Sequence, residues 1–208
     1  MKHIFIALEG IDGSGKTTQA KLLAEELTRA GHKVHATFEP TKRHIGSLLR
    51  DILTGKKQAD EKTIAALFLA DRLDHLLNEE DGLVKMMREG YTVVSDRYYF
   101  SSYAYHGTHM DMGWVIECNR MCAGILKPDV NIFIDVTPEV AMQRITANRA
   151  TTELYETLDN LTAVRNKYME AFSLLKDQEH IAIIDGNRGF EAIATDVFLE
   201  AESLLLKH

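Results

Sequence analysis

The amino-acid sequence predicts an α/β protein in which helices cover both faces of a parallel sheet. Short runs rich in β-branched and aromatic residues alternate along the chain with longer amphipathic runs. The first short run, Ile4–Leu8, is wholly apolar, as expected for a parallel strand that is buried on both faces. No segment has the composition of a linker, so we expect residues 1–208 to form one domain.

Five strands are expected, and each ends near a Gly, Asp or Pro residue. Because a helical run separates each strand from the next, the connections should be right-handed crossovers between parallel strands. The expected strands are His3–Glu9, Lys33–Phe38, Tyr91–Asp96, Val130–Val136 and His180–Asp185.

Eight helices are expected from apolar residues that recur every three or four positions. The first helix ends at a glycine, Gly31, and Thr137 followed by Pro138 is a favourable start for a later one. The expected helices are Lys16–Ala30, Ile45–Thr54, Thr63–Leu77, Leu83–Glu89, Trp114–Ala123, Pro138–Asn148, Leu158–Asp177 and Phe190–Leu206.

Charge and composition exclude several classes of protein. The 31 acidic and 24 basic side chains give a net charge of −7 without a Lys/Arg stripe, which argues against nucleic acid as a partner. No run approaches the roughly 20 apolar residues that cross a bilayer, and we expect a cytoplasmic protein. Cys118 and Cys122 are expected to be free thiols in a reducing compartment, since a zinc site needs more ligands.

The segment Gly10–Thr17 fits the pattern G-x-x-x-x-G-K-[ST] without a mismatch. It follows the first strand and opens the first helix, so its backbone N–H groups and the helix N-terminus can bind phosphate. Lys16 supplies charge at the β- and γ-phosphates, and the Thr17 hydroxyl is a natural Mg²⁺ ligand. The expected ATP-binding residues are Gly10, Ile11, Asp12, Gly13, Ser14, Gly15, Lys16, Thr17 and Thr18.

This P-loop alone does not choose among GTPases, ATPases and kinases. A GTPase should carry N-K-x-D after a strand, whereas Asn166 and Lys167 precede Tyr168 and Met169 inside an expected helix. A motor or transporter ATPase usually has further domains, for which this chain has no room. A small-molecule kinase needs a second anion site and mobile cations, and the sequence has candidates for both.

Further segments follow the P-loop in an order and at spacings that are specific as a set. They are Leu8–Gln19, Phe38–Thr41 with Ile45 and Gly46, Phe68–Arg72, Asp96–Tyr105, and Lys127–Asp129 leading into Ile132–Val136.

Over its whole length the chain resembles the thymidylate kinase family of P-loop nucleoside-monophosphate kinases. The resemblance implies a three-layer α/β/α P-loop kinase fold with a five-stranded parallel sheet, a short lid and a homodimer. It also implies transfer of the γ-phosphoryl group of MgATP to dTMP, which gives dTDP and ADP.

Asp96 and Arg97 end an expected strand, so they emerge at the sheet edge where α/β proteins bind ligands. The resemblance implies that Asp96 holds Mg²⁺ or its water, and that Arg97 grips the acceptor phosphate.

The resemblance also implies a thymine pocket. Phe68 and Arg72 are four residues apart on a helix and share a face. In the family this pair stacks on the thymine ring and hydrogen-bonds its carbonyl. Ser101 and Ser102 would lie near the base, and Tyr105 would crowd the sugar 2′ position.

Two carboxylates complete the expected acceptor site. Asp12 matches a family residue that meets the sugar 3′-hydroxyl, and Glu39 matches one that orders the Mg²⁺ and acceptor site. Some relatives carry an arginine where this chain has Thr41, so Lys42 or Arg43 is a candidate replacement.

A lid is expected at about residues 149–157, between two helices. The P-loop contains no arginine, so the resemblance implies that the lid supplies the transition-state cation. Arg149 is the candidate for it, and Arg144 is better placed to stack on adenine. Tyr155 would contact the acceptor sugar; the residue before it is Leu154, where some relatives have an arginine.

Alternative functions remain open at this point. Another pyrimidine deoxynucleoside or nucleoside-monophosphate kinase would share most of these features. A deoxynucleoside kinase would need a base near a 5′-hydroxyl, for which Glu39 is a candidate. A nucleotide-dependent binding protein without turnover is the alternative from another class.

Overall fold

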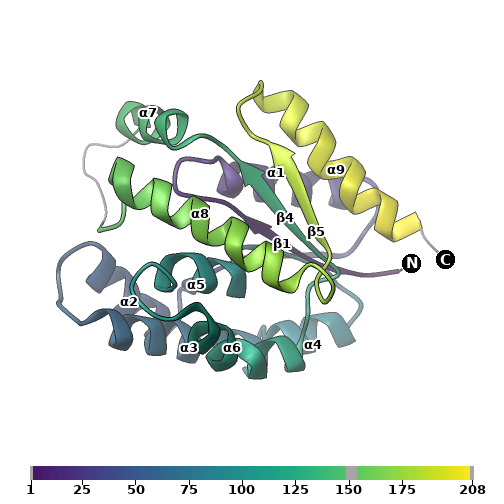
Figure 1. Cartoon of the computed structure of the whole chain (residues 1–208). Helices are drawn as coiled ribbons and strands as arrows, with labels where there is room; N and C mark the ends of the chain where they lie inside the picture. The colour runs from purple at the N-terminus through teal and green to yellow at the C-terminus, as the bar shows by residue number, and fades with distance from the viewer. Residues whose placement is uncertain (1, 149–153, 207–208) are drawn as a thin grey trace.

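A computed structural model describes residues 2–148 and 154–206 of the chain. The described residues form one sheet of five parallel strands in the order β2-β3-β1-β4-β5. Figure 1 shows β1, β4 and β5 of this sheet side by side. The strands are β1 (Phe5–Glu9), β2 (Val34–Phe38), β3 (Thr92–Asp96), β4 (Val130–Asp135) and β5 (Ile181–Asp185). All five expected strands are thus confirmed, with ends that differ by one to two residues.

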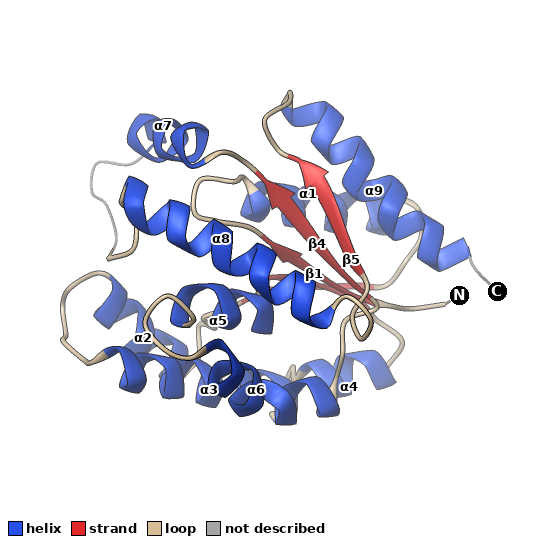
Figure 2. Ribbon diagram, in the orientation of Figure 1, coloured by secondary structure: helices blue, strands red, loops and turns tan. Residues whose placement is uncertain are grey.

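Nine helices lie within the described residues, on both faces of the sheet (Figure 2). The expected α/β/α arrangement is confirmed. The helices are α1 (Lys16–Arg29), α2 (His44–Leu53), α3 (Glu61–Leu77), α4 (Leu83–Arg88), α5 (Tyr99–His106), α6 (Met112–Ile125), α7 (Pro138–Asn148), α8 (Leu158–Leu175) and α9 (Phe190–Leu206).

Alternation along β1 divides the core into two layers. Ile4, Ile6 and Leu8 belong to the cluster that packs on α1 and α9. Phe5 and Ala7 belong to the cluster formed with α5, α8 and the helices beyond them. Since side chains alternate between the two faces of a strand, Glu9 is directed to the same face as Phe5 and Ala7.

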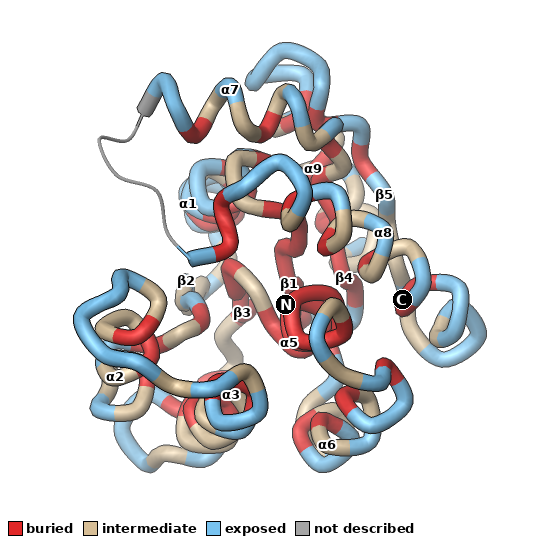
Figure 3. Tube along the Cα trace, turned by 60° about the vertical axis from the view of Figure 1, so that its left-hand side comes forward, coloured by how far each residue is buried: buried red, intermediate tan, exposed pale blue. Residues whose placement is uncertain are grey.

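The helix α5 was not among the expected helices. All eight of its residues are buried, and Figure 3 draws it as buried along its length. A helix that is covered on every side has no polar face, so the periodic pattern that indicates a surface helix is missing. Its sequence, with five aromatic or imidazole rings and two serines, therefore does not identify it.

The sheet order places β1 between β3 and β4, so the loop after β1 lies where the strand order reverses. In open α/β sheets this is the position at which ligands bind. The register of β1 and β3 pairs Leu8 with Asp96. Consequently the first residues of the P-loop lie beside Arg97.

Among the described residues, no helix has the length and apolar character needed to span a membrane.

Gly46 allows α2 to approach the loop before it. A Cβ atom at this position would lie 2.0 Å from the carbonyl oxygen of Thr41. Asp71 fixes Thr41 by accepting hydrogen bonds from its backbone N–H and its hydroxyl, at 2.7 and 2.6 Å. The backbone at Thr41 therefore has little freedom to move away.

We expect Gly46→Ala to lower the free energy of unfolding by about 1–3 kcal/mol, because the added methyl group overpacks a fixed backbone contact. Gly124→Ala is the matched control, since a Cβ atom at Gly124 in α6 meets nothing within 4 Å. That change should raise stability by up to about 1 kcal/mol through helix propensity. Urea denaturation of both variants measures the difference, and equal stabilities would contradict the expectation.

Candidate active site

The P-loop turns tightly between β1 and α1. Gly13 has φ 80°, and a Cβ atom there would lie 2.4 Å from the carbonyl oxygen of Ala141. Gly15 adopts the left-handed conformation that starts α1 at Lys16. The buried hydroxyl of Ser14 has no hydrogen-bond partner among the described residues. A cradle of backbone N–H groups with an unpaired hydroxyl suits a phosphate chain.

Four side chains from three segments meet at the P-loop. The Asp12 carboxylate accepts from the Arg97 guanidinium, from the Tyr105 hydroxyl at 2.9 Å and from Lys16 Nζ at 3.4 Å. Burial alone would raise the pKa of Asp12, but Arg97 and Lys16 outweigh it and hold this pKa at about 2. Asp12 is therefore ionised throughout the physiological range. The cluster carries two cations against one carboxylate, so it attracts anions.

Thr17 and Asp96 offer oxygen ligands on the other side of Lys16. The Thr17 hydroxyl donates to Asp96 Oδ2 at 2.5 Å, which joins the end of β3 to α1. The buried Asp96 Oδ1 has no hydrogen-bond partner among the described residues. Hard oxygen atoms beside a phosphate cradle fit Mg²⁺, which binds one or two protein oxygens together with phosphate oxygens.

A large cavity follows the P-loop toward the last strand. Arg144, from α7, donates to the carbonyl oxygens of Ser14 at 3.3 Å and Gly186 at 2.9 Å. It thereby links the P-loop to the turn after β5. The cavity is lined by Asp12, Gly13, Ser14, Gly15, Lys16, Thr17, Thr18, Gln19, Arg97, Arg144, Ile145, Arg188, Phe190 and Ile193. Every residue expected to bind ATP lines it, except Gly10 and Ile11.

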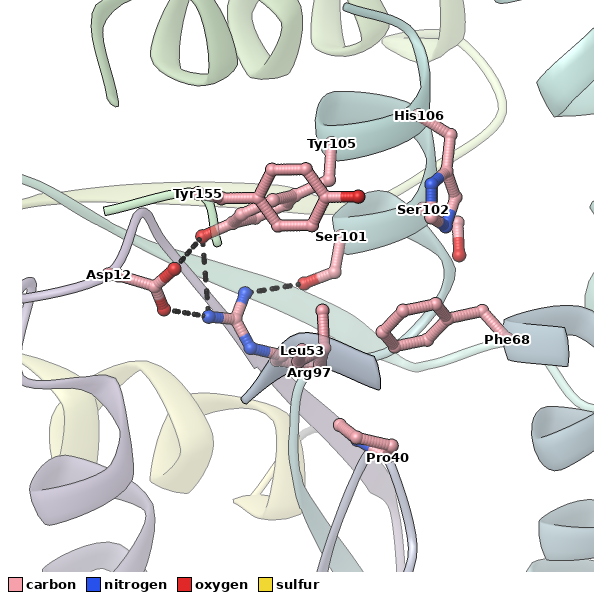
Figure 4. Close-up of a pocket in the computed structure, with 10 residues that line it drawn as sticks. All are labelled: Asp12, Pro40, Leu53, Phe68, Arg97, Ser101, Ser102, Tyr105, His106 and Tyr155. Carbon is pink, nitrogen blue, oxygen red and sulfur yellow. Dashed lines mark hydrogen bonds and ion pairs between the residues drawn. The ribbon is translucent and has the colours of Figure 1, made fainter. Parts of the chain in front are cut away.

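Asp12 and Arg97 also line a second cavity, which Figure 4 shows. These two residues line both cavities and are ion-paired with each other. The second cavity is lined by Asp12, Pro40, Leu53, Phe68, Arg97, Ser101, Ser102, Tyr105, His106 and Tyr155. Six of the expected acceptor residues besides Asp12 are thus brought together: Phe68, Arg97, Ser101, Ser102, Tyr105 and Tyr155.

The apolar wall of this cavity pairs two rings. Phe68 and His106 lie 5.2 Å apart between ring centroids, and His106 is 2% exposed. Burial, and next the nearby Arg72 charge, lower the pKa of His106 to about 3, so its imidazole is neutral. His106 Nδ1 has no hydrogen-bond partner among the described residues. A slot lined by these two rings, one of which has a neutral ring nitrogen, suits an uncharged heterocycle.

Arg72 lies behind this wall. Its guanidinium donates to Glu39 at 2.9 Å, Ser102 Oγ at 2.9 Å, Asn119 Oδ1 at 2.5 Å and the carbonyl oxygen of Tyr98 at 3.1 Å. Only 1% of its side chain is exposed, and it is not among the described residues that line either cavity. Its connection to the acceptor cavity runs through Ser102, which does line it.

Glu39 likewise lies outside the two cavities, as far as the described residues define them. Its carboxylate binds Arg72 and lies 3.0 Å from His75 Nδ1. Although burial alone would raise the pKa of Glu39, Arg72 and His75 lower it below its usual value. Glu39 is therefore linked to the wall of the cavity through Arg72, which donates to Ser102.

The candidates to replace the family arginine at Thr41 lie elsewhere. Arg43 forms ion pairs with Asp74 at 2.7 Å and Glu80 at 3.0 Å. Lys42 lies over the ring of Phe38. Within the described chain neither lines either cavity.

The described part of the expected lid contacts the acceptor side. The Tyr155 hydroxyl donates to Glu61 at 2.7 Å, and its ring lies 5.8 Å from the ring of Tyr105. The backbone N–H of Leu154 donates to the carbonyl oxygen of Leu53 at 3.3 Å. Arg149, the expected transition-state cation, lies outside the described residues.

Sequence reasoning did not single out Pro40, Leu53 or His106 as cavity residues, nor Glu9 as a polar residue beside them. Glu9 had a usable signal, because a charged residue at the end of an apolar strand is unusual unless it is paired. His106 had no such signal. Because α5 was not expected, the sequence did not indicate which way the His106 side chain points.

Comparisons with known proteins agree with this geometry. A model of the thymidylate kinase family matches residues 8–197. A probable thymidylate kinase of Staphylothermus marinus is 36% identical over 207 residues, which cover 98% of this chain and 95% of the relative. Probable thymidylate kinases of Methanocaldococcus jannaschii and Pyrobaculum aerophilum are 38% and 39% identical over 88% and 93% of this chain, and over 87% and 93% of their own lengths. The resemblance noted in the sequence is confirmed: the chain belongs to the thymidylate kinase family of P-loop nucleoside-monophosphate kinases.

Proposed function

We propose that this protein transfers the γ-phosphoryl group of MgATP to the 5′-phosphate of dTMP, giving dTDP and ADP. The observation that carries the proposal is the meeting of two cavities at Asp12 and Arg97. The cavity that contains the P-loop takes ATP, and the cavity with Phe68 and His106 takes the monophosphate. Transfer between two bound nucleotides needs this end-to-end arrangement, in which the reacting groups are held in line.

On the donor side, the P-loop backbone and Lys16 bind the β- and γ-phosphates. Thr17 and Asp96 would hold Mg²⁺, which neutralises charge on the phosphates when it is bound. Arg144 lines the far part of the cavity with Phe190, which suits the adenine end of ATP. These residues position the γ-phosphate toward Arg97.

On the acceptor side, Arg97 binds the 5′-phosphate of dTMP. A phosphate monoester has its second pKa near about 6, so the attacking oxygen is already largely ionised at neutral pH. No general base is required, and the burial of Glu39 against Arg72 and His75 disfavours it as a base for a 5′-hydroxyl. Catalysis rests on alignment and on charge neutralisation by Lys16, Arg97, Mg²⁺ and a lid cation.

The base is selected by the slot beside Phe68. The Phe68 ring stacks on thymine, while Ser102 and the neutral His106 offer polar atoms to the edge of the base. Arg72 and Glu39 fix Ser102 from behind. Tyr105 and Asp12 meet the sugar, which favours a 2′-deoxyribose, and Tyr155 covers it from the lid.

The direct test is a panel of acceptors with MgATP, read as ADP release. We expect dTMP to be the best acceptor and dUMP to be used with about 10- to 200-fold lower kcat/KM, because one methyl group provides only about 1–3 kcal/mol. Purine monophosphates should be rejected by the shape of the slot. Thymidine tests the deoxynucleoside kinase alternative, and a preference for CMP, GMP or thymidine would contradict the proposal. ATP binding without ADP release for any acceptor would indicate a binding protein instead.

We assign the transition-state cation of the lid to Arg149, and adenine binding to Arg144. Arg149→Ala should then lower kcat on the order of 10³-fold with little change in the KM for ATP, since a transition-state charge acts mainly on turnover. Arg144→Ala should chiefly raise the KM for ATP. Steady-state kinetics of the two variants separates the roles, and the reverse pattern would assign the transition-state role to Arg144.

We further propose that the protein acts as a homodimer in the cytoplasm. Large apolar side chains exposed on α3 and α6, which contact each other, support the dimer: Leu77, Trp114 and Met121 are 56%, 48% and 64% exposed. Both cysteines are free, as in a reducing compartment. Light scattering should give twice the chain mass of 23.5 kDa, and the monomer mass would contradict the dimer.

A further inference from the structure

Glu9 is a fully buried carboxylate for which the proposed transfer has so far no role. It is the last residue of β1 and immediately precedes the P-loop. Because its side chain is directed to the face of Phe5 and Ala7, it enters the layer formed by α5 and α8 rather than the nucleotide cavities. There it meets polar groups from both helices.

Four hydrogen-bond donors converge on this carboxylate. Oε1 accepts from the backbone N–H groups of Tyr98 at 2.8 Å and Ser101 at 3.3 Å. Oε2 accepts from the hydroxyls of Ser101 at 2.6 Å and Tyr168 at 2.9 Å. A group surrounded only by donors must be an acceptor at both oxygens, which an ionised carboxylate satisfies and an amide does not.

The groups that Glu9 holds are those that surround Arg97. Arg97 has φ 77° and is the non-glycine residue with a positive φ in the described chain. Such a backbone is strained and persists only where neighbouring contacts fix it. The N–H of Arg97 donates to the carbonyl oxygen of Leu8 at 2.9 Å, and the next N–H, of Tyr98, donates to Glu9.

The side chain of Arg97 is fixed through the same carboxylate. Arg97 Nη1 donates to Ser101 Oγ at 3.1 Å, and that hydroxyl in turn donates to Glu9. Glu9 thus accepts hydrogen bonds both from the backbone N–H that follows Arg97 and from the Ser101 hydroxyl that accepts one from the Arg97 guanidinium. No other described carboxylate makes both contacts.

We propose that Glu9 is the positioning residue that aims Arg97 at the phosphate of the acceptor nucleotide. The inference rests on the proposed function, in which Arg97 binds that phosphate. Glu9 itself touches neither nucleotide. Its effect should therefore appear in acceptor binding and turnover, and not in the binding of ATP.

Burial makes Glu9 an unfavourable residue for stability alone. It raises the pKa of the carboxyl above its ordinary value, against the opposing effect of its hydrogen bonds and of Arg97. A carboxyl whose pKa is higher in the folded protein loses stability as the pH rises through that pKa. Glutamine keeps the shape and one acceptor oxygen of this side chain and is not subject to that loss, so Glu9→Gln removes the charge with the least change in packing.

The test compares Glu9→Gln with Glu179→Gln. Glu179 is the matched control because it also accepts a tyrosine hydroxyl, from Tyr99 of α5 at 2.9 Å, and burial also raises its pKa. We expect Glu9→Gln to weaken dTMP binding at least about tenfold in calorimetry, the effect of losing charge-assisted hydrogen bonds, and to lower kcat. The KM for MgATP should change less than about twofold. Glu179→Gln should leave dTMP binding and both KM values unchanged.

A double-mutant cycle with Arg97→Lys tests the route of the effect. If Glu9 acts through Arg97, Glu9→Gln should weaken dTMP binding no further in the Arg97→Lys protein. Additive losses would contradict the proposal, as would a normal affinity for dTMP in Glu9→Gln. Equal losses in the two KM values with a lowered melting temperature would assign Glu9 a structural role instead.

Two further measurements keep the outcome clear. If Glu9→Gln does not fold, Tyr168→Phe removes one donor to the carboxylate and should weaken dTMP binding in the same direction by a smaller factor; unchanged binding would overturn the proposal.

Wild-type protein that does not bind dTMP would contradict the proposed function. Normal dTMP binding by the wild type and weakened binding by Arg97→Lys, beside normal binding by Glu9→Gln, would contradict the role of Glu9 alone.

Discussion

The parallel pairing of β1 with β3 is the constraint on which the rest of the site depends. Because Leu8 pairs with Asp96, the residues that leave the two strands, Glu9 on one and Arg97 on the other, emerge side by side. The P-loop continues from the first strand and the acceptor site from the second. Two separate cavities therefore share a border, which is formed by the ion pair of Asp12 with Arg97. A shift of one residue in this register would turn these side chains to the opposite face of the sheet.

Buried ion pairs hold the side chains around this border in place, at a cost in the free energy of folding. Arg72 and Glu39 are almost completely enclosed, and such pairs often contribute little to folding because desolvation opposes their attraction. Such pairs instead fix the orientation of the side chains, because each guanidinium N–H that donates to a fixed acceptor leaves the arginine fewer rotamers. The Ser102 side chain in the wall of the acceptor cavity and the Arg97 guanidinium are both oriented in this way before any nucleotide binds. Preorganised groups stabilise charge without having to reorient during the reaction.

The parts of this architecture that could be predicted from the sequence are those encoded by neighbouring residues. The P-loop, the five strands and the polar residues at the end of β3 follow from local pattern and from the direction of parallel strands. The helix α5 could not be identified, because a helix buried on every side lacks a polar face. The resemblance directed Arg72 toward the base, whereas in the structure its guanidinium is turned to Asn119, 47 positions later in the chain, and to Glu39. Contacts of this range depend on how α3, α5 and α6 pack, and no spacing along the chain encodes them.

The hydrogen bonds that hold Leu154 and Tyr155 have a consequence for a side reaction, the hydrolysis of ATP without an acceptor. A phosphotransferase that neutralises the γ-phosphate without an acceptor present would waste ATP by passing the phosphoryl group to water. The backbone N–H of Leu154 donates to Leu53 at the end of α2, and the Tyr155 hydroxyl donates to Glu61 at the start of α3. Leu53 and Tyr155 line the acceptor cavity and are not among the described residues that line the ATP cavity. A ligand in the acceptor cavity would therefore meet Leu53 and Tyr155, which take part in the hydrogen bonds that hold residues 154 and 155. With the transition-state cation at Arg149, as proposed, this attachment would couple its approach to occupancy of the acceptor site and so limit futile hydrolysis.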